Sequence, residues 1–194
     1  MKKSAALLMV FVLAFLFCAC KKDKKENTVT GADIEYYAKI GQIPESDIKL
    51  SADPDSVLSE LKKSQNSSDL ESHDHEEGGE EIEVPVIESG DYSEILGNNF
   101  QYYYKTEDKS GGITAITATA AAFGYDPDTV LIEIENDLKS RNIKYEVTSG
   151  KLSDFYFFSF SDDNCEFLTC ESEKNSVVFA FIESKLSAAA VYAK

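Results

Sequence analysis

The nine residues DPDSVLSEL at positions 53–61 recur as DPDTVLIEI at positions 126–134. Each copy opens with an Asp that can cap a helix, then Pro at the first helical position and a second Asp suited to the positive end of the helix dipole. Apolar residues follow at helical spacing. The pattern predicts two amphipathic helices, which begin at Pro54 and Pro127.

The two copies lie 73 residues apart (126 − 53), and the same shift aligns Ile113 with Leu186 and Ala120 with Ala193. Such self-similarity predicts that the chain contains one structural unit twice. The shift divides the chain into copies at 48–120 and 121–193.

The first copy carries extra residues after its helix. Ser89-Gly90 matches Ser149-Gly150 at a shift of 60, so the first copy is longer by about 13 residues (73 − 60). We place this insertion at 66–79, where the sequence reads NSSDLESHDHEEGG.

Aromatic and β-branched runs separated by turn-like sequences predict antiparallel strands joined by short hairpins. These runs lie at 82–88, 100–105 and 112–120 in the first copy, and at 145–147, 154–160, 165–172, 177–183 and 186–193 in the second. Pro85 restricts the first run to a sheet edge. We expect an α+β fold of two tandem units, each with one helix packed on an antiparallel sheet of three to five strands.

One sequence pattern involves the segments Lys49–Leu61, Ile113–Leu131 and Phe181–Tyr192. It consists of a helix that begins after Asp or Gly, then a hairpin, then a closing segment of aromatic and small residues such as AAFGY. In this pattern the chain resembles the tandem repeats of β-lactamase inhibitor proteins and the single domain of SmpA/OmlA-type (BamE-like) lipoproteins. The sequence SADPD departs from it, because the usual Gly before the helix is absent from the first copy. Those families are non-enzymatic protein binders, so the resemblance implies an architecture and a binding role, without any particular binding residue.

The N-terminus indicates export. MKK is followed by an apolar run at 5–17, as in a secretory signal peptide, and the run is shorter than the roughly 20 residues of a membrane-spanning helix. Ala19-Cys20 resembles the lipobox of bacterial lipoproteins, although Phe17 stands where Leu is usual. We expect a signal peptide at 1–19, lipid on Cys20, and a polar, flexible linker at 20–32. The alternative is an ordinary signal peptide cleaved near Ala19.

After the signal peptide and the linker, the two α+β units occupy 33–120 and 121–194. We expect them on the outer face of a bacterial membrane. Lysines in KKDKKE can lie against anionic headgroups next to the lipid. The chain carries a net charge of −16, which repels phosphate backbones and argues against nucleic acid as a partner. We expect a protein, peptide or glycan partner instead.

The acidic insertion offers one candidate metal site. His73, Asp74, His75 and Glu76 could ligate a divalent cation such as zinc, because imidazole and carboxylate groups are its ligands. The alternative is a solvated acidic loop with weak, unspecific ion binding. No other cofactor is expected.

Cys165 and Cys170 are the thiols of the expected globular part. A disulfide between them is not expected if CEFLTC is one strand, because five residues separate the pair by about 16 Å and direct the side chains to opposite faces. No catalytic set of residues is recognisable.

Tyrosines cluster at 36–37 and 102–104. They form either an exposed aromatic surface for a partner or strand cores. The sequence therefore predicts a non-enzymatic binding or assembly lipoprotein, with an extracytoplasmic metal-binding protein as the alternative.

Overall fold

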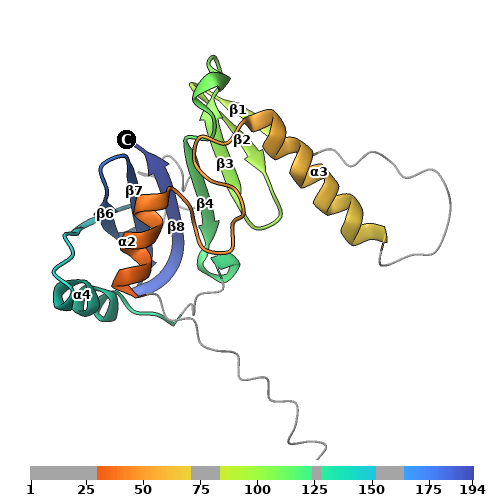
Figure 1. Cartoon of the computed structure of the whole chain (residues 1–194). Coiled ribbons are helices and arrows are strands. Elements are labelled where there is room, and N and C mark those ends of the chain that lie inside the picture. Colours follow the sequence, from red (N-terminus) through yellow and green to blue (C-terminus); the bar gives the residue numbers. More distant parts are fainter. Residues whose placement is uncertain (1–29, 71–83, 124–127, 152–163) are drawn as a thin grey trace, which may run out of the picture.

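The computed structural model describes residues 30–70, 84–123, 128–151 and 164–194. These residues form an α+β fold with three α-helices and one eight-stranded antiparallel sheet (Figure 1). The helices are α2 (Gly31–Ile40), α3 (Pro54–Leu70) and α4 (Leu131–Ser140). The strands are β1 (Val86–Ser89), β2 (Tyr92–Leu96), β3 (Gln101–Lys105), β4 (Ala115–Thr119), β5 (Glu146–Lys151), β6 (Asn164–Glu171), β7 (Asn175–Ile182) and β8 (Lys185–Ala193). Two 3-10 helices, η1 (Lys109–Gly111) and η2 (Ala120–Phe123), flank β4.

The strand order is β1-β2-β3-β4-β8-β7-β6-β5. Each half of the sheet is a meander of four strands consecutive in sequence, and the halves meet where β4 pairs with β8. One continuous sheet thus replaces the expected separate sheets of three to five strands, because two strands from distant parts of the chain complete each other's hydrogen bonding.

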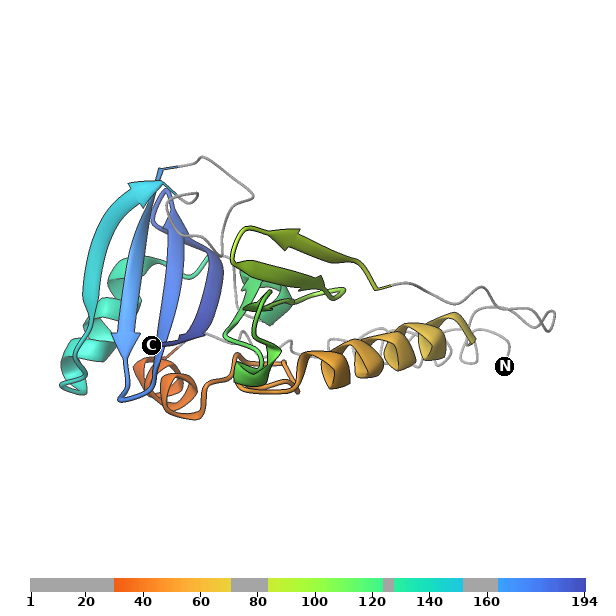
Figure 2. The same ribbon diagram turned by 90° about the horizontal axis from the view of Figure 1, so that it is seen from above.

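The main core lies between the helices and one face of this sheet. Ile34 of α2, Val57 of α3 and Ile134 of α4 are buried in the same apolar cluster as sheet residues such as Phe179 and Val191. Figure 2 shows α2 and α4 on the same side of the sheet. A smaller buried cluster occupies the opposite face of β6, β7 and β8.

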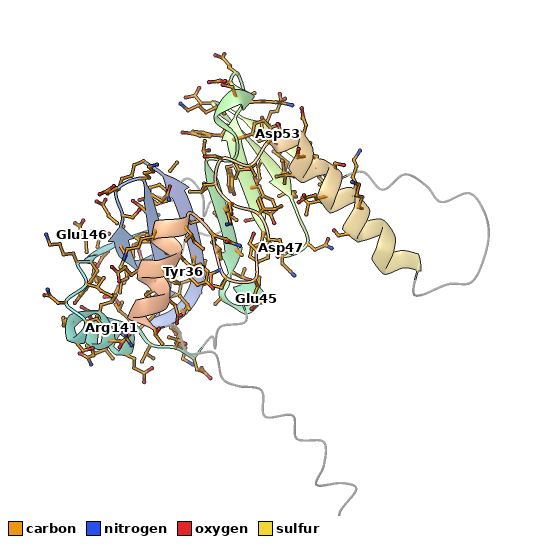
Figure 3. The ribbon with its side chains drawn as sticks, viewed as in Figure 1. Tyr36, Glu45, Asp47, Asp53, Arg141 and Glu146 are labelled. Atoms are coloured by element: carbon orange, nitrogen blue, oxygen red, sulfur yellow. The ribbon has the colours of Figure 1, made fainter. Side chains whose placement is uncertain are left out.

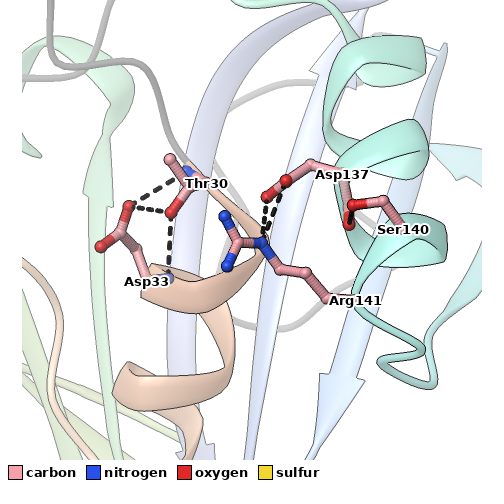
Figure 4. Close-up of polar contacts among 5 residues, drawn as sticks. All are labelled: Thr30, Asp33, Asp137, Ser140 and Arg141. Carbon is pink, nitrogen blue, oxygen red and sulfur yellow. Dashed lines mark hydrogen bonds and ion pairs between the residues drawn. The ribbon is translucent and has the colours of Figure 1, made fainter.

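Helix α2 is absent from the sequence prediction, which treated residues up to 32 as linker. Thr30 and Asp33 form a capping box, in which the Asp33 backbone N–H lies 3.3 Å from Thr30 Oγ1 and the Thr30 N–H lies 3.1 Å from Asp33 Oδ2 (Figure 4). Gly41 ends the helix at φ 64°, a left-handed conformation that favours glycine. These two signals in the sequence would have located the helix.

The start of α3 confirms its prediction. Asp53 accepts a hydrogen bond of 3.0 Å from the Ser56 backbone N–H, and the helix begins at Pro54 (Figure 3). The helix continues to Leu70, so residues 66–70 of the predicted insertion at 66–79 are helical. Positions 71–79 lie outside the described residues.

The predicted start of the second helix at Pro127 is wrong, because α4 begins at Leu131. Val130 is extended and pairs with Lys185, and the Leu131 N–H donates to the Ser184 carbonyl at 3.0 Å. This pairing with the beginning of β8 holds residues 129–130 out of the helix. Asp126 and Pro127 themselves lie outside the described residues, as does the strand expected at 154–160.

Candidate functional site

A groove of about 790 Å³ lies between the first turns of α3 and the entry to β1. It is lined by Asp55, Leu58, Ser59 and Lys62 of α3 and by Val84, Pro85 and Val86. We call this the edge groove, because β1 is the outermost strand on its side of the sheet. Figure 2 shows the beginning of α3 beside the β1–β2 hairpin and the rest of the helix extending beyond it.

The helix wall of the groove is anchored at its beginning. Val57 is buried, and Leu58 and Leu61 pack partly buried against the main core. Asp55 forms an ion pair of 3.0 Å with Lys109, whose ammonium lies 5.6 Å from the centre of the Tyr104 ring. The burial of Val57 holds the first turns of α3 against the core, and the exposed ion pair with Lys109 adds little to this.

The strand wall presents unpaired backbone groups. The Leu96 N–H donates to the Pro85 carbonyl at 3.0 Å, and the register continues with Ile87 opposite Glu94. In an antiparallel pair the hydrogen-bonded residues alternate, so the N–H and C=O groups of Val86 and Glu88 point away from β2. No described strand lies on that side of β1.

The groove and the strand edge expose apolar and acidic groups together. Val86 is 40% and Ile87 47% exposed. Glu88 is exposed on the same strand. At the start of α3, hydrogen bonds from the Ser56 hydroxyl and backbone hold the pKa of Asp53 below its usual value. That carboxyl is therefore charged at neutral pH and caps the helix.

The sequence prediction found part of this site. Pro85 indicated an edge strand, and its position directly before the outermost strand β1 confirms this. The groove itself had no signal in the sequence, because its two walls come from segments that only the fold brings together.

The predicted site residues at the N-terminus and in the acidic segment lie outside the described residues: Cys20, His73, Asp74, His75 and Glu76. Among the residues that the structure describes, no three His, Cys, Asp or Glu side chains gather where they could hold a metal ion. None of the described helices combines the length and hydrophobicity that crossing a membrane requires.

Cys165 and Cys170 are both buried on β6, and they form no disulfide with each other. Cys165 belongs to the small cluster on one face of the sheet, and Cys170 to the main core on the other. The Cys165 thiol lies 3.6 Å from the Gly150 carbonyl. Burial raises the pKa of Cys170 to about 12, which makes its thiolate, the reactive form, scarce at neutral pH.

The tyrosine clusters have different locations. Tyr102, Tyr103 and Tyr104 on β3 are all buried, so this run belongs to the interior. Tyr36 on α2 is 57% exposed and lies edge-on to Tyr37, with 5.3 Å between the ring centres. A single exposed ring is too small to form the aromatic surface considered above.

Comparisons with protein-family models, with curated proteins and with solved structures found no match to this chain.

Proposed function

We propose that this chain is a non-enzymatic binding or assembly module, anchored to the outer face of a bacterial membrane through lipid on Cys20, with the edge groove as its binding surface. The main support for the proposal is the position of the groove beside β1, whose outer edge pairs with no described strand. Edges of this kind are usually short, charged or covered, because they pair readily with other chains. Here the edge of β1, on which no described strand pairs, lies beside a groove lined by both polar and apolar residues, which suits a surface for a partner.

The distance from the anchor to the folded part is consistent with a role close to the membrane. Ten residue steps separate Cys20 from Thr30, the cap of α2 (30 − 20). A fully extended chain of that length spans at most about 35 Å. The tether therefore keeps Thr30 within that distance of the membrane and the folded part close to its surface, where the partner is expected.

The architecture proposed for this module is a tandem duplication. The 73-residue shift makes Thr117 equivalent to Ala190 (190 − 117), and these two residues lie directly opposite each other in the β4–β8 pair. On either side, Ala115 lies opposite Tyr192, the equivalent of Thr119, and Thr119 lies opposite Ala188, the equivalent of Ala115. Reciprocal pairing of this kind is what a two-fold axis through the pair requires.

The strand order supports the same relation, because it reads from each edge inwards as four consecutive strands. Two meanders related in this way share one sheet and bury more apolar surface than either does alone. The proposed kinship with β-lactamase inhibitor proteins and SmpA/OmlA-type lipoproteins depends on this duplication.

The proposed function can be tested by crosslinking in the bacterium that produces the protein. A photoreactive p-benzoylphenylalanine replaces Ser59 in the edge groove, and a control chain carries it at Glu133, which is exposed on α4. We expect a discrete covalent adduct from position 59 in the membrane fraction and none from position 133. Cys20→Ala is expected to remove the protein and the adduct from that fraction. Adducts of equal yield from both positions, or none from position 59, would refute the groove as the binding surface.

A further inference from the structure

We propose that a second pocket, at the turn between β2 and β3, binds a neutral sugar residue of a glycan. We call it the turn pocket, and its volume is about 360 Å³. The residues that line it are all uncharged: Gly97, Asn98, Asn99, Gln101, Ala118, Thr119 and Ala122. This site goes beyond the proposed binding function, because it is separate from the edge groove.

The fold leaves this space open where the β2–β3 turn meets the end of β4. The Gly97 N–H donates to the Phe100 carbonyl at 2.9 Å and closes the turn. Gln101 is the first residue of β3 and pairs with Thr117, and beyond this pair β4 continues into η2. A Cβ on Gly97 would lie 2.8 Å from the Phe100 oxygen, so position 97 has to remain without a side chain. The glycine and the two alanines of the lining therefore keep the pocket from being filled.

The lining favours an uncharged ligand. Charged residues make up 28% of the chain, and the edge groove includes Asp55 and Lys62, whereas the turn pocket includes none. An ionic ligand would lose hydration water in this pocket without gaining a counter-charge. A neutral ligand avoids that cost, so charge selects against phosphates, carboxylates and amines.

The polar side chains of the pocket suit hydroxyl groups. Amide and hydroxyl side chains both donate and accept hydrogen bonds, and a sugar hydroxyl also does both. The Gln101 amide is oriented in advance, because the hydroxyl of the fully buried Thr117 donates to Gln101 Oε1 at 2.8 Å. Its oxygen is thus engaged, and its amide N–H groups are the ones that can donate to a ligand. A side chain held in this way loses less conformational entropy on binding.

The position of the pocket favours a compact ligand over a polypeptide. Strand β3 pairs with β2 on one side and with β4 on the other, so an extended peptide has no strand edge to pair with at this place. A volume of about 360 Å³ is near the lower end of the usual range of ligand pockets. A sugar residue combines small size, several hydroxyl groups and no charge, and it is therefore the class of ligand that fits the pocket best.

The test uses the full chain in a detergent without a sugar head group, since such head groups would compete for the pocket. The probes are the neutral disaccharides maltose, cellobiose and N,N′-diacetylchitobiose, together with an uncharged peptide of Ser and Asn. Saturation-transfer NMR detects binding, and titration of the backbone amide signals gives the dissociation constant. We expect at least one disaccharide to bind, with the largest shifts at Asn98, Asn99 and Thr119, and the peptide not to bind.

Variants of the lining test the assigned contacts. Gln101→Glu keeps an acceptor for Thr117 and removes the amide N–H groups, so the affinity for the sugar should fall at least about fivefold. Thr117→Val removes the hydroxyl that orients Gln101 and should weaken binding about threefold. Thr119→Trp fills the pocket and should abolish binding, whereas Thr148→Trp, at an exposed position of β5 outside the lining, should not. Circular dichroism establishes that each variant is folded, and Gln101→Glu carries the test if Thr119→Trp is not.

Three outcomes would overturn the turn pocket as a sugar site: no binding of any disaccharide, sugar binding that Gln101→Glu and Thr119→Trp leave unchanged, and binding of the peptide in place of the sugars. The crosslink from position 59 in cells should persist in the Thr119→Trp chain, because the two sites are separate, and its loss would contradict that separation. A persistent crosslink without sugar binding would leave the edge groove standing and remove this inference alone.

Discussion

Replacement of Gly112 by Ala should destabilise the protein strongly. Gly112 has φ 70° and ψ −162°, a conformation that is almost confined to glycine and costs other residues about 1–3 kcal/mol. An added Cβ would also lie 2.6 Å from the backbone carbon and oxygen of Ser51 and 2.8 Å from the Ala52 oxygen. Because these are backbone atoms, the segment before α3 has to move.

That movement breaks further contacts. The Ser51 N–H donates to the Ile113 carbonyl, and the Ile113 N–H donates to the Ala52 carbonyl, both at 2.8 Å. Each bond contributes about 0.5–1.5 kcal/mol. Together with the backbone strain, Gly112→Ala should lower the free energy of unfolding by about 2–6 kcal/mol.

The neighbouring glycine provides the control. A Cβ on Gly111 meets no heavy atom within 4 Å, and Gly111 is exposed, so Gly111→Ala should change the free energy of unfolding by less than about 0.5 kcal/mol. Urea unfolding followed by circular dichroism measures both variants. With a slope of about 2 kcal/mol per molar urea, a loss of about 4 kcal/mol lowers the midpoint by about 2 M. If the two variants unfold within 0.3 M of each other, the close approach of Gly112 to Ser51 is not part of the folded state in solution.

Four other predictions concern titration, reactivity, location and metal. The pKa of Asp53 is lowered in the folded state, so its stabilising effect is complete above the unfolded value near 3.9 and disappears as the pH falls through the lower folded value. The difference in urea midpoint between the native chain and Asp53→Ala should therefore be larger at pH 6 than at pH 2.5, and a difference independent of pH would contradict this. The buried Cys170 thiol, with its raised pKa, should react with Ellman's reagent at pH 8 only after urea unfolds the chain, and rapid reaction of the folded protein would disprove its burial. Cys20→Ala should move the protein from the membrane to the soluble fraction, and retention in the membrane would eliminate the lipid anchor. Deletion of 71–79, which begins after the end of α3, should leave zinc binding measured by calorimetry weak and unchanged, whereas a submicromolar affinity lost on deletion would establish the metal-binding alternative.

The sequence by itself determined the features that depend on local chemistry. Asp53 and Pro54 begin α3 as predicted, because a cap and a proline act on the first turn wherever it lies. Pro85 marks an edge, because a residue without an N–H cannot stand inside a ladder. The runs predicted at 100–105, 112–120, 165–172, 177–183 and 186–193 contain β3, β4, β6, β7 and β8 within a few residues. Two elements were missed despite local signals: the capped helix α2, and strand β2 after the Gly90-Asp91 turn.

Tertiary structure decided the features that depend on contact between segments far apart in the chain. The motif at 126–134 repeats the first helix start, yet α4 begins only at Leu131, because Val130 pairs with Lys185 and the hydrogen bonds of β8 outweigh local helix preference. The joining of two meanders into one sheet depends on the β4–β8 pair, whose strands are separated in the chain by 65 intervening residues (185 − 119 − 1). The edge groove exists only because packing of Val57 in the core places the first turns of α3 beside the entry to β1. Periodicity and capping act over a few residues, and they carry no information about which distant surfaces will meet.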